Sequence, residues 1–117
     1  MLTEFGKICR KIRIESNELM ADMASNLGVS TAFLSAVEHG RKKVPDGWVD
    51  MISEIYDIDE VTTRKIKNAA LESIKQVRIN LEDKSDSEKE LVVAFARSFE
   101  KMTEEDKERL LELLRKE

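Results

Sequence analysis

The stretch Met20–Gly40, MADMASNLGVSTAFLSAVEHG, constrains the fold of this chain more than any other. Met23, Ala24 and Leu27 have the spacing of one buried helical face, and Gly28 then supplies a residue that accepts the positive φ angle of a helix end. Two short helices joined by so tight a turn cross steeply, and their closest approach has room only for a small side chain such as Ala24. The stretch therefore predicts two crossed helices, not an open helical hairpin.

The second helix of this pair begins after Ser30, whose hydroxyl is suited to cap the first backbone N–H groups of a helix. Leu34 and Val37 repeat at the i, i+3 spacing of its inner face, and Gly40 marks its C-terminal stop. We therefore expect a helix of about two turns that buries one side and exposes the other.

This pattern resembles the helix-turn-helix of the Cro and Xre-type repressor family over about the first half of the chain, from Thr3 to Tyr56. The resemblance implies a lambda-repressor-like, five-helix DNA-binding domain. It is carried by Met23, Ala24, Leu27, Gly28, Val29, Leu34 and Val37, followed by Glu38, His39 and Gly40.

Composition favours an all-α protein that binds any nucleic acid through a local patch. Of 117 residues, 38% are charged and only 5% are aromatic, which suits helices packed on aliphatic side chains. The net charge of −4 argues against binding through overall charge. A single cysteine, the lack of a long apolar run and the lack of a signal-peptide core predict a cytoplasmic protein with no membrane partner.

Arg13, in the first helix, is a candidate ion-pair partner for Glu38, which stands where the family has an acidic residue after its recognition helix, the helix that here begins after Ser30. Thr3 is the expected N-cap of the first helix, and the apolar spacing of the following residues predicts one buried face. The resemblance implies an ion pair between Arg13, at the apolar edge of this helix, and Glu38. The alternative is two solvated side chains.

The start of the second helix departs from the family pattern. Leu19 and Met20 stand where the family has a capping Ser or Thr followed by Gln. Neither side chain can accept a backbone N–H, so we expect the cap to be Asn17 or Ser16.

The remaining helices are predicted from capping and apolar spacing. A fourth helix contains Trp48, which we expect in the core, and Asp59 caps a fifth that runs to about residue 75. Ser85 and Thr103 begin capping boxes for helices 86–101 and 104–116. This divides the chain into a DNA-binding domain, residues 1–75, and a dimerisation or partner-binding segment, residues 76–117. The last two helices have more apolar surface than a hairpin can bury in itself, so they either fold back on the fifth helix or pack on a partner.

Residues 77–82 alternate apolar and polar side chains, the spacing of a half-buried strand. A lone strand leaves its backbone groups unpaired, so pairing with the same strand of a second copy predicts a dimer contact at Val77, Ile79 and Leu81. The alternative is that the fifth helix continues through this segment.

The outer face of the recognition helix is the candidate DNA-binding site. Small residues allow close approach to a major groove, hydroxyls can reach base edges or phosphates, and methyl groups or Phe can contact thymine methyls. The basic residues after the helix can bind flanking phosphates, although a solvated basic loop is the alternative. The candidates are Ser30, Thr31, Ala32, Phe33, Ser35, Ala36, His39, Arg41, Lys42 and Lys43.

An enzyme is not indicated, and neither a catalytic residue, a cofactor nor a metal site is predicted. His39 is the only histidine, and Cys9 lies on the apolar face of the first helix. The sequence has neither a glycine-rich phosphate loop nor metal-ligand spacing.

Two functions fit these patterns. The first is a sequence-specific regulator of transcription, a repressor of phage or mobile-element type that binds double-stranded DNA as a homodimer on an inverted repeat. The second is an antitoxin that binds a toxin protein through its C-terminal half and regulates its own operon.

Overall fold

The structure, a computed structural model, describes residues 1–116 and confirms the all-α class for them. Seven α-helices and one short 3₁₀ helix form this part of the chain, and no strand occurs in it. The chain divides into two compact units, Met1–Val77 and Arg78–Glu117, here called the N-terminal and C-terminal units.

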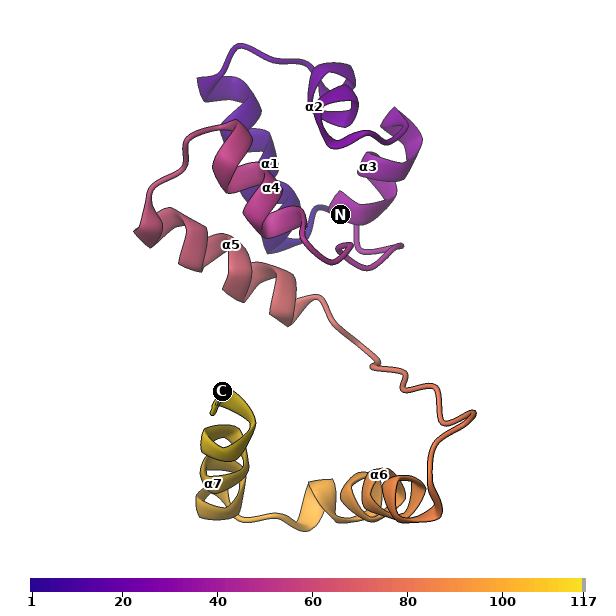
Figure 1. Ribbon diagram of the computed structural model, residues 1–117. Helices are drawn as coiled ribbons and strands as arrows, with labels where there is room; N and C mark the ends of the chain where they lie inside the picture. The colour runs from indigo at the N-terminus through magenta and orange to yellow at the C-terminus, as the bar shows by residue number, and fades with distance from the viewer. Residues whose placement is uncertain (117) are drawn as a thin grey trace. The chain divides into compact units, whose positions relative to one another are not determined.

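Five helices build the N-terminal unit (Figure 1). Helix α1 packs against α3 and α5, α2 packs against α3 and α4, and α4 also packs against α5. Each helix therefore buries one face among the others. Their bounds are Glu4–Glu15 for α1, Met20–Leu27 for α2, Thr31–Glu38 for α3, Trp48–Ile55 for α4 and Glu60–Glu72 for α5.

All the buried hydrophobic residues of the described chain lie in the N-terminal unit. They come from all five helices, and the small Ala24, only 2% exposed, is among them. Trp48 is also buried, as predicted for a core residue. The complete set is Phe5, Cys9, Ile12, Met23, Ala24, Leu27, Leu34, Val37, Trp48, Ile52, Ile66 and Ala69.

The predicted N-caps are confirmed at five helices. In each case a side-chain oxygen accepts a hydrogen bond from a backbone N–H of the first turn, which would otherwise have no partner within the helix. The capping residues are Thr3 for α1, Ser30 for α3, Asp59 for α5, Ser85 for α6 and Thr103 for α7.

The predicted cap of α2 is wrong. Ser16 ends α1, and Asn17 lies in the turn with a φ of 55°. Helix α2 begins at Met20 with Leu19 as its N-cap residue, and the carboxylate of Asp22 accepts the Leu19 backbone N–H at 2.8 Å. The acidic residue of the first turn thus satisfies a donor from inside the helix, without a polar residue at the cap position.

The C-terminal unit contains α6 (Asp86–Ser98), the 3₁₀ helix η1 (Phe99–Lys101) and α7 (Glu104–Arg115). Within its described part no residue is buried. Leu91, Phe95 and Phe99 are 69%, 46% and 50% exposed, although the rings of Phe95 and Phe99 touch at a centroid separation of 5.8 Å. Capping and local contacts define these helices, while their apolar sides remain uncovered.

The predicted strand at residues 77–82 is wrong, and α5 does not continue through this segment either. The segment has no regular secondary structure, and Val77 and Ile79 are 79% and 59% exposed. Near its end the Asn80 side chain accepts the Glu82 backbone N–H, a local turn bond that needs no second strand. Alternation alone does not make a strand where no described strand lies beside it to complete the ladder. The dimer contact inferred at Val77, Ile79 and Leu81 lacks the strand that it required.

Candidate nucleic-acid interface

The turn between α2 and α3 fixes how the candidate recognition helix leaves the core. Gly28 adopts a φ of 72°, and the Val29 backbone N–H donates to the carbonyl of Ala24 at 2.9 Å. This left-handed residue closes α2 and redirects the chain, after which Ser30 caps α3. Ala24 is buried, and α3 packs on α2.

The inner and outer faces of α3 divide as its sequence predicts. Leu34 and Val37 are 0% and 2% exposed, whereas Thr31 and Ala32 are exposed. Ser35 and Ala36 are half-buried at the edge of the outer face. The accessible part of α3 is therefore a low ridge of methyl and hydroxyl groups at its N-terminal end.

Phe33 belongs more to the packing of the unit than to the outer ridge. It is half-buried, and its ring meets the ring of buried Trp48 edge to face, with centroids 6.0 Å apart. This contact joins α3 to the start of α4. Only the remaining exposed edge of Phe33 is available to a ligand.

Two polar candidates are partly engaged by the protein backbone. The Ser30 hydroxyl oxygen accepts the Phe33 backbone N–H at 3.0 Å, and its hydrogen can still be donated. His39 Nδ1 lies 2.8 Å from the carbonyl oxygen of Ser35. Because a carbonyl oxygen only accepts, Nδ1 carries the hydrogen of this contact.

The three cations after α3 leave the helix through a left-handed glycine. Gly40 has a φ of 77°, and its N–H donates to the Val37 carbonyl, while the Arg41 N–H donates to the Ala36 carbonyl at 2.8 Å. These two bonds close the last turn of α3 and satisfy its terminal carbonyls. Arg41, Lys42 and Lys43 are all exposed directly beyond this turn.

The charge of Glu38 is balanced inside the protein by that of Arg13. Its carboxylate is fully buried and receives both guanidinium nitrogens of Arg13, with Nη1 at 2.5 Å and Nη2 at 3.0 Å. The bidentate hydrogen bond to Glu38 raises the pKa of Arg13 above its ordinary value. Arg13 also donates to the Met23 sulfur, so this pair connects α1, α2 and α3.

The exposed charges of the stretch that contains α3 are positive although the chain is acidic overall. Glu38 is the only acidic residue between Asp22 and Asp46, and it is buried against Arg13. The exposed ionised groups of that stretch are the cations that follow α3, Arg41, Lys42 and Lys43. A polyanion that contacts α3 therefore meets no exposed carboxylate from this stretch.

Two residues that tie α1 to the end of α3 were not predicted to contact it. The Thr3 N–H and hydroxyl both donate to the Glu38 carbonyl oxygen, at 3.0 and 2.9 Å. A Cβ placed on Gly6 would lie 2.4 Å from the same oxygen, so only glycine permits this approach. The glycine inside a helical pattern was the available signal, since glycine there is unfavourable without a packing reason.

Cys9 lies beside the ion pair as a buried, protonated thiol. It is 0% exposed, and burial raises the pKa of its thiol to about 12, with the charge of Glu38 acting in the same direction. A thiol of this kind is a poor nucleophile at neutral pH. Cys9 therefore fills space in the core.

No helix among the described residues is long and apolar enough to cross a membrane. Comparisons of the chain with protein families, with curated proteins and with solved structures give no match. The functional argument therefore depends on the chemistry and geometry of the residues themselves.

Proposed function

We propose that this protein is a sequence-specific regulator of transcription of the Cro and Xre type, a repressor that binds an inverted repeat in double-stranded DNA as a homodimer. The proposal includes a lambda-repressor-like arrangement of α1–α5. One observation carries it: between Asp22 and Asp46, every exposed ionised group is a cation, and these cations directly follow a helix whose outer residues are small or hydroxylated.

In this proposal α3 lies in the major groove, and the cations beyond it bind the flanking phosphates. The methyl groups of Thr31 and Ala32 contact thymine methyls, and the Thr31 hydroxyl contacts a base edge or a phosphate. No side chain of the α3 ridge offers the bidentate base contacts typical of Arg or Asn. Specificity then depends on methyl contacts and DNA shape more than on guanine recognition.

The buried ion pair supports this role by fixing α3. The ends of α3 are held by the Ser30 cap and by the bonds of Glu38 to Thr3 and Arg13. A helix held at both ends keeps its outer face in a constant orientation. Two such helices in a symmetric dimer would enter major grooves on one face of the duplex, where successive grooves are about 34 Å apart.

The deciding experiment is binding of the full chain to DNA upstream of its own gene, followed by protection mapping. Ala32→Glu places a carboxylate on the exposed ridge and should abolish binding. Asn68→Glu makes a similar change at an exposed position of α5 and should not. Failure of the wild type to bind that DNA above its background affinity for unrelated duplexes would contradict the proposal.

A matched pair of triple variants tests the phosphate contacts. Changing Arg41, Lys42 and Lys43 to Ala should weaken binding to every sequence and reduce the slope of log K against log salt by about 0.9 for each phosphate that is no longer neutralised. The control changes Arg64, Lys65 and Lys67 of α5 to Ala, which removes the same charge from exposed positions of another helix. Equal effects in both triples would indicate general charge attraction only.

The second candidate function is an antitoxin. The uncovered apolar side of α6, with Leu91 and Phe95 exposed, is the observation that favours it, because such a surface suits a protein partner. Stoichiometric co-purification with the product of an adjacent gene, abolished by Leu91→Asp, would support this function.

A further inference from the structure

The apolar side of α7 is a second uncovered surface, and its charges indicate what covers it. Leu114 follows Leu110 by four residues and Leu111 by three, so the three leucines form one stripe, the leucine stripe, in which Leu110 is half-buried. Leu111 and Leu114 are 47% and 73% exposed. Isolated helices of this length are marginal in water, so α7 needs a packing partner.

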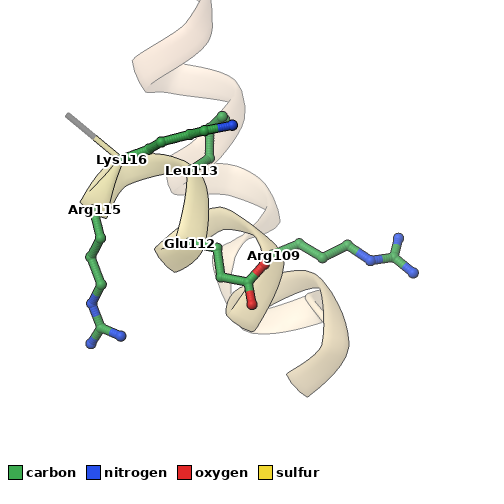
Figure 2. A pocket seen from close by; sticks show the side chains of 5 residues that line it. All are labelled: Arg109, Glu112, Leu113, Arg115 and Lys116. Atoms are coloured by element: carbon green, nitrogen blue, oxygen red, sulfur yellow. The ribbon is translucent and has the colours of Figure 1, made fainter.

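A pocket lies at the end of α7, but a ligand bound there would not serve as the packing partner of the leucine stripe. Its lining comes from α7 and the residue that follows it, and the guanidinium groups of Arg109 and Arg115 point away from each other (Figure 2). Leu113, which also lines it, is 64% exposed. This is an open depression between side chains on a helix surface.

The stripe is bordered on one edge by two opposite charges. Glu108 precedes Leu111 by three residues and Arg115 follows it by four, so both side chains flank the same edge. They stand seven residues apart, about 10 Å along the helix, which is too far for a close ion pair within one copy. Both are exposed.

An antiparallel second copy of α7 satisfies this arrangement. A two-fold axis through the helix pair near Leu111 places the stripes face to face. The same axis brings Glu108 of each copy opposite Arg115 of the other, which gives two equivalent ion pairs. The acidic first turn of each helix also comes near the basic last turn of its partner.

We infer that the leucine stripe of α7 is a homodimer interface, in which two copies pack antiparallel with Glu108 of each facing Arg115 of the other. This inference deepens the proposed function and rests on it, because binding to an inverted repeat requires a symmetric dimer. The interface itself is testable without DNA.

The test is sedimentation equilibrium of the full chain in the absence of DNA. The wild type should be a dimer. Glu108→Arg and Arg115→Glu should each raise the dimer dissociation constant by about tenfold, because each turns two attractive pairs into two repulsive ones. The double variant Glu108→Arg/Arg115→Glu should restore the wild-type value. Both substitutions lie in the same chain, so the second can restore what the first removes only when the partner is another copy of this chain.

Two further variants separate the interface from helix stability. Glu112→Arg changes the same charge on the side of α7 away from the stripe and should leave the dissociation constant unchanged. Leu114→Ser should give monomers while Trp48 fluorescence in the N-terminal unit stays as in the wild type. A monomeric wild type, a double variant as weak as the singles, or an equal effect of Glu112→Arg would overturn the inference. Absence of DNA binding in a wild type that is dimeric would count against the proposed function alone.

Discussion

The buried pair of Arg13 and Glu38 allows a quantitative test of how α3 is held. The two side chains are 7% and 0% exposed, so neither charge is stabilised by water when its partner is removed. Breaking such a pair on one side costs about 3–5 kcal/mol. Arg13→Met and Glu38→Met should therefore each lower the free energy of unfolding by about this amount, and the Tm by at least about 12 °C.

Replacing both residues should cost far less than the two single changes together. With neither charge left in the core, the free energy of unfolding of Arg13→Met/Glu38→Met should be within about 1 kcal/mol of the wild-type value, which gives a coupling energy of at least about 5 kcal/mol. Urea unfolding followed by the fluorescence of Trp48, the only tryptophan, measures all four proteins.

The control is the exposed pair of Glu4 and Lys7 on the same helix. Its side chains are 61% and 59% exposed, and the same cycle of Met substitutions should give a coupling energy below about 0.5 kcal/mol. Equal coupling for the two pairs would refute the reasoning. So would a double variant at Arg13 and Glu38 as unstable as the sum of its singles.

Three further outcomes follow from the packing of the N-terminal unit. Gly6→Ala should lower the free energy of unfolding by about 1–3 kcal/mol, because its Cβ would stand 2.4 Å from the Glu38 carbonyl oxygen. Urea unfolding measures this change, and an unchanged free energy of unfolding would contradict the close contact. A thiol reagent at pH 8 should label Cys9 only at the rate at which the N-terminal unit opens, since the pKa of its thiol is raised to about 12; rapid labelling of the folded protein would contradict its burial. The free energy of unfolding should fall as pH rises from about 9 to about 12. Folding raises the pKa values of Cys9 and Tyr56 from 9.0 and 10.0 to about 12, so in this range the unfolded chain loses protons that the folded chain keeps. Tyr56→Phe should flatten the upper part of this pH dependence in equilibrium unfolding, and an unchanged slope would exclude a contribution from Tyr56.

Local signals in the sequence predicted the helices. Thr3, Ser30 and Asp59 cap helices because a hydroxyl or carboxylate reaches a backbone N–H only three residues away. The cap of α2 was missed because its acceptor, Asp22, lies inside the helix and not before it.

The strand at residues 77–82 failed for a related reason. Alternation is visible in one segment, but a strand also needs a neighbour, and pairing is not a local property. The approach of Gly6 to the Glu38 carbonyl likewise joins residues far apart in the chain. For α3, the sequence predicted which face is buried, while the contact between Phe33 and Trp48 required the structure.

Residues 73–85 connect α5 to α6 without a helix or strand. Their length affects which DNA sites a dimer joined through α7 could bind. Fully extended, this tether spans about 40 Å. If the copies are joined through α7, each N-terminal unit is held at high local concentration near the other without a fixed separation. On the proposed function, such a dimer should accept half-sites at several spacings on one face of the duplex, so its operators should be recognised by their repeated halves more than by a fixed number of base pairs between them.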